Sequence, residues 1–120
     1  MSATTELIDR YLAAWNETDG ARRRELIAQA WTESGSYQDP LMRAEGHGDL
    51  EALAQGVQQR FPGHRFRRTG EPDGFQDRVR FGWEFGMEGQ PPMLTGVDFG
   101  VVAEDGRFQA ITGFFDQKVG

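Results

Sequence analysis

Asp98 stands at the centre of an apolar run, and its type and position favour chemistry. The run is Gly-Val-Asp-Phe-Gly-Val-Val, residues 96–102. If the side chain faces a pocket, the loss of solvent favours the neutral carboxyl group, which can donate a hydrogen bond to an oxyanion that develops on a substrate. A charged carboxylate at the same place could instead act as a base. The alternative is a strand acid that faces water or pairs with Arg80 across the sheet.

A second acid, Asp39, directly precedes Pro40. Asp-Pro is common in turns, so one interpretation is a turn; the other is a general base at the mouth of a pocket, because two acids in different environments can divide the acid and base roles. Tyr37 shares a face with Asp39, since residues two apart in an extended segment point the same way. Tyr11 lies beside Trp15 on a predicted helix, where its hydroxyl needs a polar partner and is either a core group or an oxyanion donor.

The other polar candidates are weaker. The two histidines, His47 and His64, lie far apart in the sequence, so we expect an ordinary surface role for each, no metal site and no cofactor. Four arginines are interpreted as a solvated edge that discourages strand pairing, with a role toward an anionic substrate as the alternative. These arginines are Arg60, Arg65, Arg67 and Arg68.

Composition excludes several classes of protein. The chain has 120 residues, no cysteine and a net charge of −6. The lack of cysteine excludes a disulfide scaffold, thiolate catalysis and an iron–sulfur cluster, and the acidic balance disfavours a nucleic-acid partner. No apolar run is long enough for a membrane span, and residues 1–6 lack the layout of a signal peptide. We therefore expect a soluble, cytoplasmic protein without a membrane partner.

Apolar periodicity predicts helices in the first half of the chain and strands in the second. The helices are predicted over residues 4–18, 21–33 and 48–60, with a short extended piece at 37–40 and a loop at 41–47. The strands are predicted over residues 64–70, 75–87, 93–103 and 107–115, with turns at 72–74, 88–92 and 104–106. The run Arg22-Arg23-Arg24 is predicted to form a solvated helix face.

This order of elements indicates the α+β class. Three N-terminal helices are expected to lie on one face of an antiparallel sheet, within a single domain that spans residues 1–120. Glycines within the strand patterns favour a strongly curved sheet. A curved sheet wrapped around helices forms a cone, and a cone of this size suits a pocket for a small molecule.

The predicted strand at 93–103 is apolar on both faces. An antiparallel strand with one wet face alternates between apolar and polar residues, so both faces of this strand should be covered. One face would line the interior, and the other would meet a second subunit. We therefore expect a homodimer through the sheet; the alternative is a monomer with scattered apolar surface residues.

Taken together, the order of elements and four short stretches resemble the nuclear transport factor 2-like superfamily, a cone fold that includes ketosteroid isomerases and SnoaL-like polyketide cyclases. The stretches are Arg10-Tyr11-Leu12, Tyr37-Gln38-Asp39-Pro40, Phe61-Pro62-Gly63-His64, and Val97-Asp98-Phe99 followed by Glu104-Asp105-Gly106-Arg107-Phe108. The resemblance implies that Asp39 is the general base, Asp98 the protonated acid of an oxyanion hole and Tyr11 the hydroxyl donor of that hole.

The resemblance also implies a small apolar partner and an acid–base isomerase or cyclase that acts on an apolar carbonyl substrate. Seven residues are expected to line the pocket: Trp15, Trp31, Tyr37, Val57, Phe61, Arg80 and Phe114. A binding module without catalysis is the first alternative. The second is an epoxide hydrolase that resembles the limonene type and uses Asp39, Arg80 and Asp98.

Overall fold

The structure is a computed structural model, and it describes residues 2–117. Its helices are α1 (Ala3–Asn16), α2 (Gly20–Ala30) and α3 (Gly46–Arg60). Polar side chains begin the first two: the Ser2 hydroxyl accepts from the amide of Thr5 at 3.1 Å, and the Asp19 carboxylate accepts from the amide of Arg22 at 2.9 Å. These caps satisfy amide groups that have no partner in the first turn of a helix.

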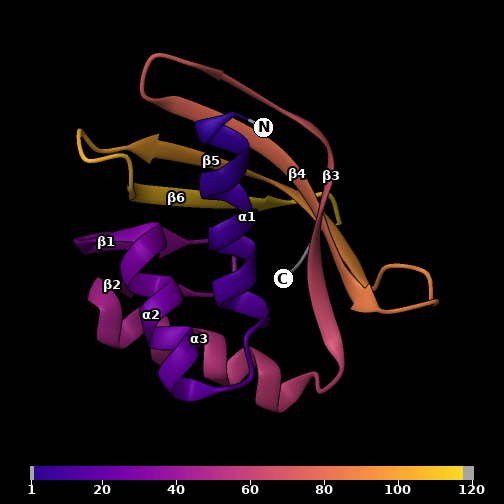
Figure 1. The fold of residues 1–120 in the computed structure, drawn as a ribbon. Coiled ribbons are helices and arrows are strands. Elements are labelled where there is room, and N and C mark those ends of the chain that lie inside the picture. Colours follow the sequence, from indigo (N-terminus) through magenta and orange to yellow (C-terminus); the bar gives the residue numbers. More distant parts are fainter. Residues whose placement is uncertain (1, 118–120) are drawn as a thin grey trace.

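Six strands form one curved, open sheet (Figure 1). They are β1 (Trp31–Gln38), β2 (Arg43–Glu45), β3 (His64–Phe75), β4 (Arg78–Met87), β5 (Leu94–Val102) and β6 (Phe108–Phe115). Their order across the sheet is β2-β1-β6-β5-β4-β3. The α+β class and the curved sheet around three helices are confirmed. One detail differs: β1 and β6 pair in parallel, so the sheet is mixed.

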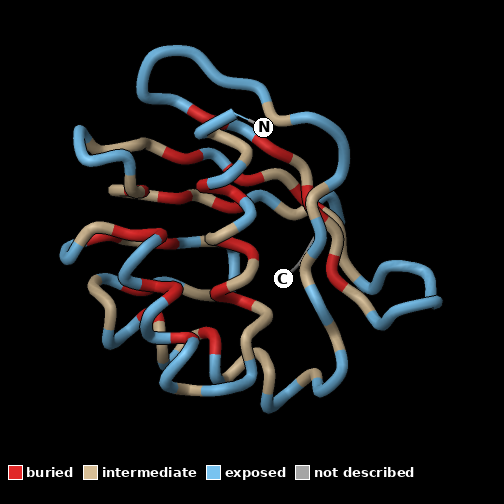
Figure 2. Tube along the Cα trace, viewed as in Figure 1, coloured by how far each residue is buried: buried red, intermediate tan, exposed pale blue. Residues whose placement is uncertain are grey.

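The core lies between the helices and the concave face of the sheet. In Figure 2 the buried segments gather where α1, α2 and α3 face the strands, whereas the end of the β3–β4 hairpin and the β4–β5 loop are exposed. Strand β4 illustrates how a strand contributes to this core, because every second residue along it is buried, namely Val79, Phe81, Trp83 and Phe85. Met87 continues the alternation but is 46% exposed at the end of the strand.

Several predicted boundaries were wrong. The second helix ends at Ala30 and not at residue 33, because β1 begins at Trp31. The predicted loop at 41–47 contains β2 and the first residues of α3, and the predicted turn at 72–74 belongs to β3. The hairpin turns at Gln76 and Asp77, where Gln76 has a positive φ of 50°. A tight turn between antiparallel strands requires such a backbone angle.

Arg23 does not belong to a solvated face, as the sequence predicted, but is 3% exposed. Its guanidinium donates to the carbonyl oxygens of Glu17 and Thr18 at 2.9 and 3.2 Å. It also donates to Glu51 and Gln58 of α3, each at 2.9 Å. A buried arginine is stable when its donors are paired in this way, and the network fastens α3 to the α1–α2 connection.

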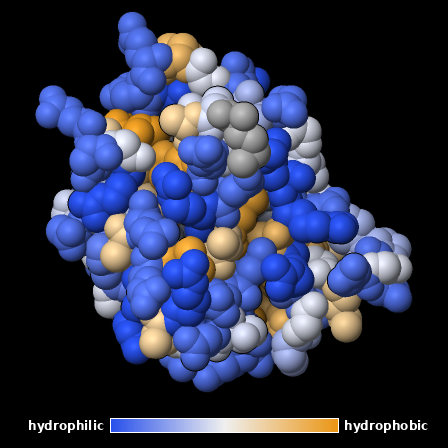
Figure 3. Space-filling model, in the orientation of Figure 1, coloured by the Kyte–Doolittle hydropathy of each residue, from blue (hydrophilic) through white to orange (hydrophobic). Residues whose placement is uncertain are grey.

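The surface drawn in Figure 3 is mostly hydrophilic, with hydrophobic side chains in small separate patches. Among residues 2–117, no helix combines the length and the apolar character that crossing a bilayer requires. Phe99 and Phe114 lie side by side on the convex face of the sheet, with ring centres 5.8 Å apart. They are 47% and 55% exposed.

Candidate active site

A cavity of about 670 Å³ opens between α3 and the concave side of the sheet. Its walls come from α1, α3 and five of the six strands, together with the segment after β1 and the β4–β5 loop, so elements distant in the sequence build it. Most lining residues are apolar, and the charged ones are Asp39 and Arg60. The full lining is Trp15, Tyr37, Asp39, Leu41, Met42, Ala52, Leu53, Gly56, Val57, Arg60, Phe61, Phe66, Trp83, Phe85, Met93, Leu94 and Phe115.

Asp39 stands on the cavity wall directly after β1. One carboxylate oxygen, Oδ1, accepts from the amides of Leu41 and Met42 at 2.8 and 2.9 Å. The other, Oδ2, accepts from the hydroxyl of Tyr37 at 2.6 Å. Pro40 keeps Asp39 out of the helical region, and the tight turn that follows brings the two amides back to the carboxylate. Three donors therefore fix this carboxylate in one orientation.

Asp98 lies at the centre of β5 on the concave side and is 3% exposed. Its Oδ2 accepts from the hydroxyl of Tyr11 at 2.6 Å, and its Oδ1 accepts from the indole nitrogen of Trp83 at 2.8 Å. Burial raises the pKa of Asp98 to about 7, although the bonds from Tyr11 and Trp83 act in the opposite direction. The charge of Asp39 adds to the increase. Asp98 thus changes protonation near neutral pH.

Both aspartates lie close to Gly113, the residue of β6 directly opposite Asp98. A Cβ atom at Gly113 would lie 2.9 Å from Oδ1 of Asp98, 3.0 Å from the Tyr37 hydroxyl and 3.4 Å from Cβ of Asp39. A side chain there would press against Asp98 and the Tyr37 hydroxyl, so the glycine leaves room for both groups. Asp39 and Tyr37 line the cavity, whereas Asp98 and Tyr11 lie behind its wall.

The chain is similar to several solved structures. The crystal structure of a SnoaL-like family protein from Agrobacterium tumefaciens str. C58, for which an isomerase activity has been suggested, is 38% identical and superposes with a TM-score of 0.91, covering 98% of this chain and 100% of that one. The chain belongs to the SnoaL-like family. No protein-family model and no curated protein matches it.

Two more distant structures share the fold of this SnoaL-like chain. A cystatin-like protein of unknown function from Methylobium petroleophilum PM1 is 15% identical with a TM-score of 0.77, covering 98% of this chain and 78% of that one. A protein with a ketosteroid isomerase-like fold from Catenulispora acidiphila DSM 44928, in complex with trimethylamine, is 14% identical with a TM-score of 0.73, covering 90% and 83%.

The structure of the SnoaL-like chain places four of the seven expected lining residues on the cavity wall, namely Trp15, Tyr37, Val57 and Phe61. Trp31 lies deeper, packed edge-on against Tyr11 with ring centres 5.0 Å apart, and does not line the cavity. Trp31 belongs to the core, because β1 begins at this residue and its side chain is fully buried.

Arg80 and Phe114 were expected in the cavity, and both expectations were wrong. Arg80 alternates with the buried Phe81, so it points to the convex side, where it donates to Asp73 at 3.2 Å. The Asp39, Arg80 and Asp98 set of a limonene-type hydrolase is therefore not assembled, and Arg80 does not pair with Asp98. Phe114 pairs with Val97 on the convex face, and the next residue, Phe115, lines the cavity.

Sequence reasoning missed the indole of Trp83 as a donor to Asp98. The alternation of Val79, Phe81, Trp83 and Phe85 indicates one apolar face of β4, but the contact with Asp98 depends on the strand register. Trp83 lies opposite Gly96, two residues before Asp98, and a Cβ at Gly96 would come within 2.5 Å of the indole ring. A tryptophan opposite a glycine, with an acid two residues further along, is the signal that could have predicted this bond.

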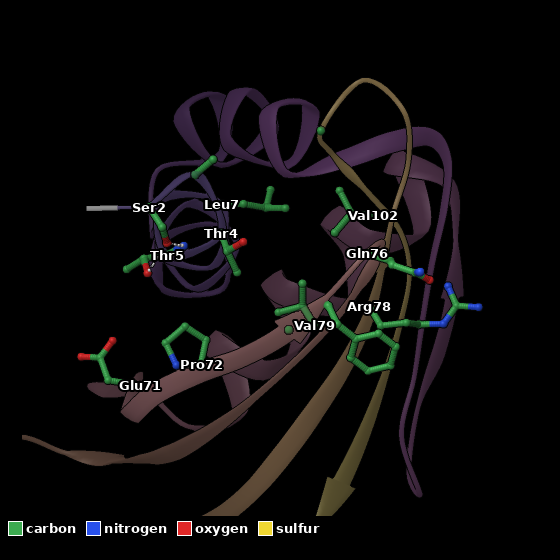
Figure 4. Close-up of a pocket in the computed structure, with 14 residues that line it drawn as sticks. Ser2, Thr4, Thr5, Leu7, Glu71, Pro72, Gln76, Arg78, Val79 and Val102 are labelled. Atoms are coloured by element: carbon green, nitrogen blue, oxygen red, sulfur yellow. Dashed lines mark hydrogen bonds between the residues drawn. The ribbon is translucent and has the colours of Figure 1, made fainter.

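A second cavity, of about 460 Å³, lies at the other end of the sheet (Figure 4). Leu7, Val79 and Val102 point toward one another there from α1, β4 and β5. Its charged lining residues, Glu71 and Arg78, are exposed, and Arg78 pairs with Asp77 at 2.9 Å. It therefore lacks the buried acid and the paired tyrosine hydroxyl that accompany the first cavity.

Proposed function

We propose that this protein is an acid–base enzyme that moves a proton on a small apolar carbonyl compound, as an isomerase or a cyclase does. One observation carries the proposal: Asp39 is the carboxyl group that the described residues present to an apolar cavity, and three hydrogen bonds hold it in place. A fixed carboxylate against an apolar ligand can remove a proton from the carbon beside a carbonyl group. The negative charge then develops on the carbonyl oxygen, and a nearby donor stabilises it.

Tyr37 is the group in this proposal that stabilises the substrate oxygen, because its side chain lines the cavity and its hydroxyl donates to the Asp39 carboxylate. When Asp39 takes the proton from the substrate carbon, the Tyr37 hydroxyl turns from Asp39 to the developing oxyanion. Asp98 and Tyr11 act behind the wall as positioning residues. Protonation of Asp98 removes a negative charge next to the Tyr37 hydroxyl, which favours an oxyanion at that place. The acid and base roles therefore belong to two carboxyl groups in different surroundings.

Exchange of substrate hydrogen for deuterium tests the proposal without knowledge of the natural substrate. A panel of small apolar ketones and esters is incubated in deuterated buffer, and deuterium at the carbon beside the carbonyl is followed by NMR. We expect the wild-type protein to accelerate exchange of at least one compound and Asp39→Asn to lower that rate by at least about 100-fold. Asp73→Asn, an exposed acid on β3, is the matched control and should leave the rate unchanged. Full exchange in Asp39→Asn would reject the proposal.

A binding module without catalysis is the second candidate, and the burial of Asp98 favours it. Both oxygens of Asp98 already accept hydrogen bonds, and the residue lies behind the cavity wall. This alternative predicts that apolar ligands raise the melting temperature of the wild type, Asp39→Asn and Asp98→Asn alike, and that no member of the panel exchanges faster than in buffer.

We further propose that the protein acts as a homodimer through the convex face of the sheet. Phe99 and Phe114 expose 47% and 55% of their surfaces there, in contact with each other. Large exposed apolar side chains of this kind are typical of subunit interfaces. Light scattering should give twice the chain mass for the wild type and the single chain mass for Phe99→Glu; a monomeric wild type would contradict the proposal.

A further inference from the structure

One basic residue lines the predominantly apolar cavity. Arg60 is the last residue of α3, and it continues a strip of that helix facing the cavity, formed by Ala52, Leu53, Gly56 and Val57. These positions recur at helical spacing, so they occupy one side of the helix. From Ala52 to Arg60 the strip is about 12 Å long, since an α-helix rises about 1.5 Å per residue. The strip thus presents an apolar surface that ends in a positive charge.

The charge of Arg60 has no carboxylate partner within 4.0 Å in the described part of the chain. Its guanidinium lies over the ring of Phe61, 5.7 Å from the ring centre, and Phe61 also lines the cavity. Arg67 and Arg68, which follow on β3, differ because they pair with Glu84 at 2.6 Å and with Asp9 at 3.7 Å. Contact with an aromatic face holds a cation in place and leaves its hydrogen-bond donors free.

We propose that Arg60 binds the carboxylate of an amphiphilic acid, so that the ligand of this cavity is an apolar molecule with a carboxylate at one end. The guanidinium presents two parallel donors that match a carboxylate, and the apolar strip accommodates the rest of the molecule. The position of the reacting carbon next to Asp39 rests on the proposed function. The preference for a carboxylate does not, because it requires no turnover.

The test compares an acid with its neutral amide of the same shape. Binding of 4-phenylbutyrate and 4-phenylbutyramide, and of decanoate and decanamide, is measured by quenching of tryptophan fluorescence, since Trp15 and Trp83 line the cavity. For at least one pair we expect the acid to bind about three- to tenfold more tightly than the amide at low salt, with the difference shrinking as salt screens the charge. Equal affinities within both pairs, or no binding of any probe at millimolar concentration, would overturn the proposal.

Three variants assign the preference to Arg60. Arg60→Gln should lower the acid-to-amide ratio to about one and leave binding of the amide unchanged. Arg65→Gln removes the same charge from an exposed position outside the cavity and should keep the ratio. Gly56→Leu, at a cavity-lining glycine with open space around its missing side chain, should weaken both probes. A ratio that survives Arg60→Gln, or is lost in Arg65→Gln, contradicts the assignment.

The outcome of this binding test can be distinguished from the outcome of the exchange test of the proposed function. If Asp39→Asn retains proton exchange but the acid preference depends on Arg60, the base assignment fails and the ligand class stands. If exchange depends on Asp39 but acids and amides bind equally, the ligand class fails and the catalytic proposal stands.

Discussion

Asp98 and Asp39 approach Gly113 together, yet their surroundings differ in one respect that changes their chemistry. Each accepts a hydrogen bond of 2.6 Å from a tyrosine hydroxyl, from Tyr11 and Tyr37 respectively. Asp98, however, is buried behind the cavity wall, whereas Asp39 stands on the wall at the end of its strand. Burial raises the pKa of Asp98 to about 7.

At Asp98, a short hydrogen bond from a tyrosine hydroxyl is not enough to keep the pKa of the carboxyl group low. For Asp98 the cost of burying a charge outweighs the two donors that favour it. Burial also raises the pKa of both tyrosine hydroxyls, so each keeps its proton and remains a donor. A buried acid that titrates near neutral pH and an acid on the wall of the cavity can therefore serve as acid and base within one site.

The largest expected effect is a dependence of stability on pH that comes from Asp98. The pKa of this carboxyl group rises from 3.8, its ordinary value in an unfolded chain, to about 7 in the folded protein. Between these values the folded state holds a proton that the unfolded chain releases. The contribution of Asp98 is thus most favourable below about pH 4, falls as pH rises to about 7, and is constant above. The total change is about 4 kcal/mol, because one unit of pKa difference corresponds to about 1.4 kcal/mol.

Urea unfolding of the wild type and of Asp98→Asn between pH 4 and pH 8 measures this contribution. Asparagine does not titrate, and its side-chain oxygen can still accept from Trp83. The free energy of unfolding of the wild type should therefore fall relative to that of Asp98→Asn as pH rises. Asp73→Asn, at an exposed carboxyl group, should run parallel to the wild type. A constant difference between the wild type and Asp98→Asn would show that Asp98 does not titrate in this range.

Local patterns predicted the parts of the site that depend on alternation within one element. The apolar stripe of α1 put Tyr11 on the inner side, and the interruption of an apolar strand marked Asp98. Phe114 and Phe115 could not be distinguished in this way, because adjacent aromatic residues fit either face. Only the pairing of β6 with β5 decides that Gly113 and Phe115 face inward.

The features that the sequence did not predict depend on distant partners. Strand β1 contains Thr32, Glu33, Ser34 and Gly35 without clear alternation, and its parallel pairing with β6 connects segments far apart in the chain. Burial of Arg23 likewise requires Glu51 and Gln58 from α3 to supply acceptors. A charged run at the surface of an isolated helix carries no sign of such partners, so the solvated interpretation was the natural one.

A smaller effect is expected from substitution of Gly113, which lies close to Asp98 and to Cβ of Asp39. Gly113→Ala would place a methyl group 2.9 Å from Oδ1 of Asp98 and 3.0 Å from the Tyr37 hydroxyl, both closer than such contacts normally are. We expect a loss of about 2 kcal/mol in the free energy of unfolding, because β6 or both side chains must shift. Gly48→Ala, in the first turn of α3 with open space around it, is the matched control and should be neutral or stabilising. Unchanged stability in Gly113→Ala would mean that Asp98 and Tyr37 do not crowd this position of β6.

The smallest expected effect is the difference in unfolding free energy between two variants, Tyr11→Phe and Tyr37→Phe. Tyr11→Phe removes a donor from the buried carboxyl group and raises the pKa of Asp98 further, since the bond from Tyr11 lowers it. Tyr37→Phe leaves Asp39 with two amide donors. We therefore expect Tyr11→Phe to cost about 1 kcal/mol more than Tyr37→Phe at pH 8, where Asp98 is mostly charged. Combining each variant with Asp98→Asn should reduce the cost of Tyr11→Phe more than that of Tyr37→Phe, because only the first hydroxyl donates to Asp98. If Tyr11→Phe and Tyr37→Phe destabilise the protein equally, both alone and when combined with Asp98→Asn, burial does not distinguish the two acids.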